Sequence, residues 1–199
     1  MKNITLDIQL IEKTKETLGG VFDHADIANL FGEPHQKQLY RRINDLIENG
    51  SLERFCRGVY ITPKFDLEVL SQKISPRSYI SFGSVLAEHL VIGSIPRYQV
   101  DAVKIGKTRV YKQGDYTVRH FGSKTSDQFG IKSIGGVRKA DAERALIDTL
   151  YFYQHGTEFY FDIFSDIDRN RFDTKKIDLY LSQNYKNQKF VNFVKGYFE

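Results

Sequence analysis

The segment 35–49 carries the side chains whose types and spacing fit a chemistry most clearly, and that chemistry is hydrogen bonding to DNA. Its apolar residues Leu39, Ile43 and Leu46 recur at helical spacing and predict one buried stripe. The opposite face of that helix holds Gln36, Lys37, Tyr40, Arg41 and Asn44. Gln and Asn can pair with adenine through two hydrogen bonds, and Arg can pair in the same way with guanine. The exposed face therefore predicts contacts with base edges in the major groove.

Four cationic side chains near this face predict contacts with the DNA backbone or the minor groove. Lys37 and Arg42 are expected on phosphates, which gives affinity but carries no sequence information. Arg54 and Arg57 flank a predicted hairpin turn, and arginines at such turns lie over a phosphate or enter a narrow minor groove. The predicted DNA-binding residues are Gln36, Lys37, Tyr40, Arg41, Arg42, Asn44, Arg54 and Arg57.

The residues around this helix predict a winged helix-turn-helix domain over residues 1–65. A first helix ends at Gly19 and Gly20, and Asp23 can cap a second short helix. A three-residue break, Gly32-Glu33-Pro34, precedes the helix at 35–49, and a two-stranded hairpin follows at 52–62. Two alternatives stay open: an amphipathic helix with an ordinary polar exterior, and a winged helix that serves as a protein–protein adaptor.

The rest of the chain predicts a connector at 66–78 and a second domain at 79–199. A helix is expected at 81–90, several strands between 98 and 139, and a clear helix from Ala142 onward. Two weaker helices are expected near 174–183 and 187–197. The predicted fold class is α+β, in which the second domain has an antiparallel sheet with flanking helices.

The charge of the chain is concentrated in its middle third. Lys plus Arg total 29 and Asp plus Glu total 25, which gives +4. Residues 1–75 hold 10 basic and 11 acidic side chains (−1), residues 76–141 hold 11 and 5 (+6), and residues 142–199 hold 8 and 9 (−1). A basic segment of this kind favours an anionic partner, nucleic acid first, although a solvated lysine-rich surface explains it as well. The candidate second basic surface comprises Lys104, Lys107, Arg109, Lys112, Arg119, Lys124, Arg138 and Lys139.

Motifs for catalysis, metals and cofactors are not found in the sequence. A nucleotidyltransferase needs a Gly-Ser pair followed by two carboxylates one residue apart, whereas Gly93-Ser94 and Gly122-Ser123 are each followed by a lone aspartate. We therefore expect no enzyme activity, no metal and no cofactor. The histidines show no ligand spacing and are expected at the surface or an interface: His24, His35, His89, His120 and His155.

The cellular compartment is predicted from the cysteine content and the apolar runs. Cys56 is the only cysteine, so an internal disulfide is impossible and a reducing compartment is favoured. No apolar run approaches the roughly 20 residues that span a bilayer, and the N-terminus lacks a signal-peptide core. We expect a cytoplasmic protein with no membrane partner.

Three segments together resemble the AbiEi-type antitoxins of type IV toxin–antitoxin systems. The first is the helix at 35–49 with Gly50–Arg54 and Arg57–Tyr60 behind it. The second, Tyr79–Leu86, is similar to the opening helix of the family's second domain, and the third, Ala142–Asp148, to a later helix of that domain. The likeness covers most of the chain. The Arg-Gly-Val-Tyr hairpin is common among winged helices, so the two later segments, in this order, carry most of the specificity.

The resemblance implies a protein that represses its own operon and neutralises a nucleotidyltransferase-like toxin encoded beside it. Family members place the winged helix on inverted repeats in double-stranded DNA, and their second domain contributes to repression and to antitoxicity. Carried over to this chain, the DNA contacts fall on Gln36, Lys37, Tyr40, Arg41, Arg42, Arg54 and Arg57. The near-neutral charge of the first domain departs from expectation, so binding is expected to need the second domain or a dimer. An alternative is that the second domain is an atypical enzyme that modifies a nucleotide or the partner protein.

Overall fold

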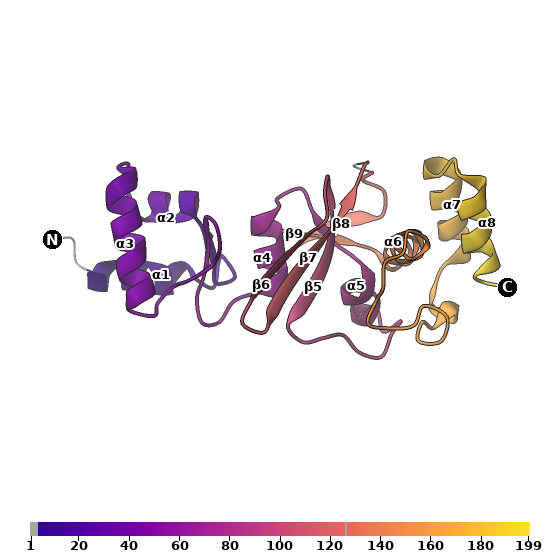
Figure 1. Ribbon diagram of the computed structural model, residues 1–199, viewed down its shortest axis with the longest axis horizontal. Helices are drawn as coiled ribbons and strands as arrows, with labels where there is room; N and C mark the ends of the chain where they lie inside the picture. The colour runs from indigo at the N-terminus through magenta and orange to yellow at the C-terminus, as the bar shows by residue number, and fades with distance from the viewer. Residues whose placement is uncertain (1–3, 126) are drawn as a thin grey trace. The chain divides into compact units, whose positions relative to one another are not determined.

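The computed structural model describes residues 4–125 and 127–199, and within them the fold is α+β with eight α-helices and two sheets (Figure 1). The chain forms two compact units. The first runs to Pro76 and includes Tyr111–Tyr116, and the second comprises Arg77–Val110 and Thr117–Glu199. The α+β class predicted from the sequence is confirmed.

The first unit contains four helices and a three-stranded sheet. Its elements are α1 (Ile4–Thr14), β1 (Val21–Asp23), α2 (His24–Phe31), α3 (Gln36–Glu48), β2 (Glu53–Cys56), β3 (Val59–Ile61) and α4 (Leu67–Ile74). The sheet is antiparallel with the order β1-β3-β2. The strand β1 was not predicted, because three residues are too few to show alternation. It pairs along β3, with Val21 opposite Ile61.

The helix α2 begins where its capping residue predicts. The Asp23 carboxylate accepts a hydrogen bond from the Asp26 amide at 2.8 Å, and the Asp23 amide donates to the Asp26 carboxylate at the same distance. Lys73 of α4 donates to both carboxylates, at 3.2 Å and 2.5 Å. This bridge ties α4, which lies in the predicted connector, to the start of α2 in the first unit.

The apolar stripe of α3 holds it to the core of the first unit. Leu39, Ile43 and Leu46 are buried, as the spacing predicted. They belong to one cluster with residues of α1, α2 and the sheet, among them Ile11 and Tyr60. Burying this stripe directs the side chains on the opposite face of α3 outward, where they can meet a partner.

The second unit is built on a six-stranded sheet. Its elements are β4 (Tyr79–Ile80), α5 (Phe82–Glu88), β5 (Gln99–Ile105), β6 (Arg109–Gln113), β7 (Tyr116–Ser123), β8 (Ile131–Ile134), β9 (Val137–Ala140), α6 (Ala142–Gln154), the 3₁₀ turn η1 (Arg169–Arg171), α7 (Thr174–Asn184) and α8 (Gln188–Gly196). Only the end of β6 and the first residue of β7, within Tyr111–Tyr116, are counted with the first unit. The strand order is β6-β7-β5-β4-β9-β8. Figure 1 shows α6 between this sheet and the pair α7 and α8.

The expectation of an antiparallel sheet is wrong, because the sheet is mixed. The strand β5 pairs with β7 in parallel, and β4 pairs with β9 in parallel. The sequence shows short turns between β5, β6 and β7, and such turns suggest neighbouring antiparallel strands. Instead, β5 ends at Ile105 beside Ser123, the last residue of its parallel neighbour β7. The strand β6 lies on the other side of β7, at the edge of the sheet.

A glycine permits this crossing. A Cβ atom on Gly122 would lie 2.0 Å from the Gly106 carbonyl oxygen and 2.6 Å from the Thr108 amide nitrogen. The Gly106 amide donates to the Ser123 carbonyl at 2.9 Å, and the Gly122 amide donates to the Thr108 hydroxyl at 2.9 Å. The segment that joins β5 to β6 therefore passes so close to Gly122 that no side chain would fit there.

The helix α6 is the centre of the second unit, and a buried polar network fastens it to β4. Asp148 accepts from the Ser81 hydroxyl at 2.8 Å, the Tyr79 hydroxyl at 3.1 Å and Arg144 Nε at 2.9 Å. Arg144 also donates to the Tyr79 hydroxyl at 2.7 Å, and its guanidinium lies 3.9 Å from the centre of the Phe129 ring. The segments Tyr79–Leu86 and Ala142–Asp148, which lie far apart in the chain, meet in this network.

Burial sets the ionisation of this network. It raises the pKa of the Asp148 carboxyl, while the Arg144 charge and the donating hydroxyl groups act in the opposite direction. Burial and then the Asp148 charge raise the pKa of Tyr79 well above its usual value, so Tyr79 stays protonated and can donate. The network consequently has a fixed pattern of donors and acceptors, and it holds α6 against β4.

None of the helices in residues 4–125 and 127–199 combines the length and the apolar character of a membrane-spanning segment.

Candidate nucleic-acid interface

The outward face of α3 presents the five polar residues that the sequence placed there. Gln36, Lys37, Tyr40, Arg41 and Asn44 are all exposed. The helix starts two residues after Pro34, and its N-cap residue His35 makes no side-chain capping bond. No acidic residue lies in its first turn, so the positive end of the helix dipole adds to the charge of Lys37. The Glu33 carboxylate already accepts a hydrogen bond from the His35 amide at 3.3 Å, so an anionic group lies beside this end of α3.

Three of the predicted residues border one surface hollow between α3 and the β2–β3 hairpin. Tyr40 of α3 and Arg54 and Arg57 of the hairpin line a hollow of about 680 Å³. Both arginines are exposed, and the Arg54 guanidinium carbon lies 5.7 Å from the centre of the Tyr60 ring. The fold thus brings helix and hairpin residues to a single surface, as a DNA interface requires.

His24 also belongs to this surface, although its spacing in the sequence did not assign it there. It is the first residue of α2, lines the same hollow, and lies with its ring centre 4.8 Å from that of Tyr40. The ring contact fixes the direction of the Tyr40 side chain. Only the position of His24 directly after the capping aspartate could have indicated that it belongs here, and that signal does not name a contact with α3.

Arg42 does not fit the phosphate contact expected of it. Its Nε donates to Asp7 at 2.9 Å, its Nη2 donates to the other oxygen of the same carboxylate, and its Nη1 lies 3.6 Å from Glu33. Both carboxylates are buried, and the Arg42 side chain is 11% exposed. The hydrogen bonds that Arg42 donates to the Asp7 carboxylate raise the pKa of Arg42. Arg42 therefore joins α3 to α1 and to the end of α2, and its charge is directed inward.

The eight residues of the candidate second basic surface do not gather on one unit. Lys112 belongs to the first unit and the other seven belong to the second. Arg119 forms a two-bond pair with the buried Asp101, and Lys139 donates to Glu88 at 3.0 Å. Burial raises the pKa of Asp101, and the hydrogen bond and charge of Arg119 oppose that rise. Arg119 therefore stabilises a buried carboxylate within the sheet. The exposed members are Lys107, Arg109, Lys112 and Lys124.

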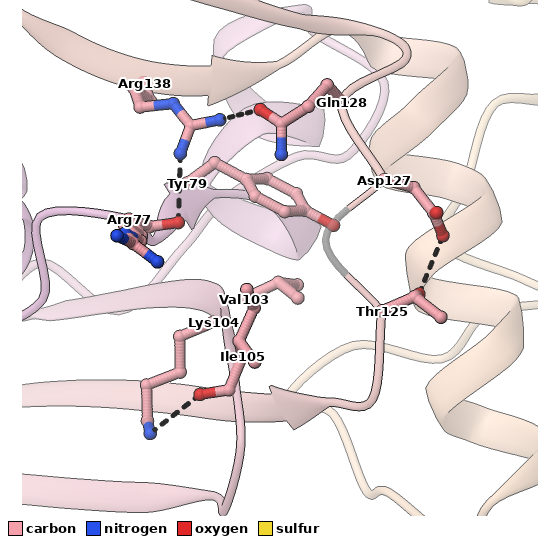
Figure 2. A pocket seen from close by; sticks show the side chains of 9 residues that line it. All are labelled: Arg77, Tyr79, Val103, Lys104, Ile105, Thr125, Asp127, Gln128 and Arg138. Carbon is pink, nitrogen blue, oxygen red and sulfur yellow. Dashed lines mark hydrogen bonds between the residues drawn. The ribbon is translucent and has the colours of Figure 1, made fainter.

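Two members of that set, Lys104 and Arg138, instead line a cavity of about 440 Å³ in the second unit (Figure 2). Arg77, which was not among the residues predicted from the sequence, lines it as well. Arg138 donates to the Arg77 carbonyl at 3.0 Å and to the Gln128 side chain. The charge count of residues 76–141 indicated that cations are concentrated in this part of the chain. It could not show that Arg77 lies beside Arg138, because that depends on the pairing of β4 with β9.

His120 is not at the surface, where it was expected. It is completely buried, because it follows Val118 on the inward face of β7. Burial, and then the charge of Lys104, lower the pKa of His120 to about 4. Within the described residues, no group of three His, Cys, Asp or Glu side chains is placed to hold a metal ion.

A comparison of the chain with protein-family models and with curated proteins gave no match. The DNA binding proposed below therefore rests on the residues and their geometry.

Proposed function

We propose that the protein is a DNA-binding transcriptional autorepressor and the antitoxin of a type IV toxin–antitoxin, or abortive infection, system. In this proposal the first unit is a winged helix-turn-helix, α3 is its recognition helix, and the β2–β3 hairpin is its wing. The protein acts in the cytoplasm on inverted repeats upstream of its own gene. Its partner is a nucleotidyltransferase-like toxin.

The observation that carries the DNA-binding proposal is the exposed polar face of α3 beside the hollow of Tyr40, Arg54 and Arg57. Arg41 and Asn44 on this face have the side chains that read guanine and adenine. The order of elements in the first unit, with a short helix, a recognition helix and a hairpin, supports the same proposal. The antitoxin role is supported by the resemblance of the two segments that meet at Asp148.

Arg41→Ala in the full chain tests the proposed recognition helix. If Arg41 reads a base, the substitution costs about 1–3 kcal/mol of specific binding free energy. The measurement is a gel shift with DNA from upstream of the gene, next to a random duplex of equal length. Arg171→Ala is the matched control, because it removes the same charge from an exposed position of the second unit. Unchanged operator binding by Arg41→Ala would remove the assignment of α3.

A co-expression assay tests the antitoxin role separately. The protein is expressed from an unrelated promoter beside the neighbouring toxin gene, and growth is measured. We expect wild type and Arg41→Ala to restore growth equally, because neutralisation is proposed not to need operator binding. Failure of the wild type to restore growth contradicts the antitoxin role. Rescue by a protein that shows no DNA binding in the gel shift instead favours the adaptor alternative.

A further inference from the structure

Two aromatic side chains of the second unit lie exposed beside each other, at the end of α6 and in the segment that follows it (orange in Figure 1). Tyr153 is 42% exposed and Phe164 is 47% exposed. Their ring centres are 5.9 Å apart, and the rings are nearly perpendicular at 88°. Single exposed apolar residues are common, but aromatic residues are enriched where proteins bind one another. The pair therefore has the character of an interface.

The backbone at Phe164 is a tight turn that fixes the position of this residue. The Asp162 carboxylate accepts hydrogen bonds from the Phe164 amide at 2.7 Å and from the Ser165 amide at 2.9 Å. The Asp162 amide donates to the Asp166 carboxylate at 2.8 Å, and the intervening Ile163 is buried. The hydrogen bonds from the Ser165 and Phe164 amides lower the pKa of the Asp162 carboxyl. A residue on a turn held in this way loses little backbone freedom when it binds, which favours affinity.

The charge of this segment is negative. Residues 153–168 contain no lysine or arginine and four exposed carboxylates, which sum to −4 in a chain of +4: Glu158, Asp162, Asp166 and Asp168. Asp168 is paired with Arg171 at 3.2 Å, whereas Asp162 and Asp166 form no ion pair within the described residues. The next cation along the chain, Arg169, donates to two backbone carbonyls. Two carboxylates beside the aromatic pair are consequently left to attract a cationic group.

We propose that Tyr153, Asp162, Phe164 and Asp166, which together form the acidic aromatic surface, bind the toxin of the proposed function directly. DNA and anionic lipids carry the same sign of charge as this surface and are repelled. A protein can instead offer lysine and arginine side chains to the carboxylates and an apolar depression to the aromatic rings. The inference rests on the proposed function for the identity of the partner. It adds that the toxin is bound by contact and that the contacting side of the toxin is basic.

The test of the aromatic pair is surface plasmon resonance with the purified full chain and the purified product of the toxin gene. We expect the wild type to bind saturably. Phe164→Ser should weaken binding about tenfold or more, mainly through faster dissociation, because it removes a central aromatic contact. Leu179→Ser is the matched control, because Leu179 is 50% exposed on α7 and is not part of this surface. Its binding should equal that of the wild type.

Asp162→Asn tests the charge in the same experiment. The side-chain oxygen of asparagine can still accept both amide hydrogen bonds, so the turn is kept while the charge is removed. We expect association to be roughly two to five times slower and less dependent on salt, with dissociation nearly unchanged, because charges at the edge of an interface steer the encounter. Asp178→Asn, at another exposed aspartate of α7, should keep the association rate of the wild type.

The proposal is wrong if the wild type does not bind the toxin, if binding is insensitive to salt, or if Leu179→Ser loses as much affinity as Phe164→Ser. Full binding by Phe164→Ser would also overturn it. Thermal unfolding shows whether each variant is folded, and if Phe164→Ser is not, Tyr153→Ser takes its place with the same expected loss. A gel shift of Phe164→Ser with operator DNA should match the wild type, and a loss there would assign the surface to DNA instead.

The co-expression assay separates this proposal from the proposed function. If the wild type restores growth but does not bind the toxin, the antitoxin role stands and the acidic aromatic surface is wrongly assigned. If the wild type binds through this surface but does not restore growth, the surface stands and the antitoxin role is contradicted. When both proposals hold, Phe164→Ser should restore growth less well than Leu179→Ser.

Discussion

At the scale of single residues, Arg41 and Arg42 are neighbours in the chain with different surroundings. Arg41 is exposed on the outward face of α3, whereas Arg42 is held by the buried carboxylates of Asp7 and Glu33. One residue of helix advances the direction of a side chain by 100°, since the helix has 3.6 residues per turn. Adjacent side chains of one type can therefore face the solvent and the interior, so that only Arg41 is available for the proposed contact with DNA.

Arg42→Met should lower the free energy of unfolding by about 3 kcal/mol or more, because it leaves two buried carboxylates without their guanidinium. Urea unfolding at neutral pH measures the change. Arg41→Met is the matched control and should change stability by no more than about 0.5 kcal/mol. A similarly small effect of both substitutions would mean that Arg42 is not needed inside and is available for the phosphate contact expected from the sequence.

The buried His120 gives the second unit a predicted loss of stability in mild acid. Its pKa is about 4 in the folded chain against 6.5 when unfolded, so the unfolded state binds a proton first as the pH falls. Stability is complete above pH 6.5 and decreases between pH 6.5 and 4. From pH 7 to pH 5 this group costs about 2 kcal/mol.

Urea unfolding of wild type and His120→Gln at pH 7 and pH 5 checks this loss. We expect the variant to be less stable at pH 7 but to lose about 2 kcal/mol less on acidification than the wild type. His35→Gln, at an exposed position without a side-chain capping bond, should retain the pH dependence of the wild type. An identical pH dependence in wild type and His120→Gln would contradict a depressed pKa at this position.

At the scale of elements, local sequence signals predicted the helices better than the sheets. The helix α3 was expected at 35–49 and spans Gln36–Glu48, since an apolar stripe and a flanking Gly50 mark a helix within its own residues. Strand pairing depends on residues far apart in the chain. The spacing of β5, β6 and β7 therefore could not show that β7 returns beside β5, and β1 could not be found before its partner β3 was known.

Gly122→Ala tests the tight crossing that the sheet of the second unit needs. The added Cβ would meet backbone atoms at 2.0 Å and 2.6 Å, and backbone cannot move aside as a side chain can. We expect a loss of about 3 kcal/mol in the free energy of unfolding, at the upper end for overpacking. Gly135→Ala is the comparison: it has a positive φ of 58° but open space around it, so its cost should be about 1 kcal/mol. If Gly122→Ala is no more destabilising than Gly135→Ala, the close approach at the crossing does not control stability.

At the scale of the whole molecule, the residues proposed to read bases and the excess positive charge lie in different parts of the chain. Residues 1–75 carry a net charge of −1 and residues 76–141 carry +6. The sequence located both features, because a charge count and a helical stripe need no tertiary information. It could not show that Arg119 and Lys139 are paired with carboxylates, or that Lys104 and Arg138 line a cavity with Arg77. Fewer positive charges of residues 76–141 are consequently available for the proposed contact with DNA than the net charge of +6 suggests.

This division predicts that specificity and electrostatic attraction can be removed separately. The double substitution Lys107→Gln with Lys124→Gln should weaken binding of operator and random duplex by the same factor. It should also reduce the slope of log K against log salt by about 1–2, since each phosphate that a cation neutralises contributes nearly one unit to that slope. Arg41→Ala should instead abolish most of the preference for the operator while changing that slope by about 1 or less.

A second pair of exposed lysines, Lys186 and Lys189, provides the control, because they lie in the near-neutral segment 142–199 and their replacement by glutamine changes the net charge equally. Their replacement should leave the salt slope unchanged if attraction arises from contacts at Lys107 and Lys124 rather than from net charge alone. Equal slopes for both double variants would show that total charge, not position, governs the attraction. Loss of operator preference in the Lys107 and Lys124 variant would place sequence recognition partly outside the first unit. The proposed division of labour requires that each measurement respond to its own set of residues.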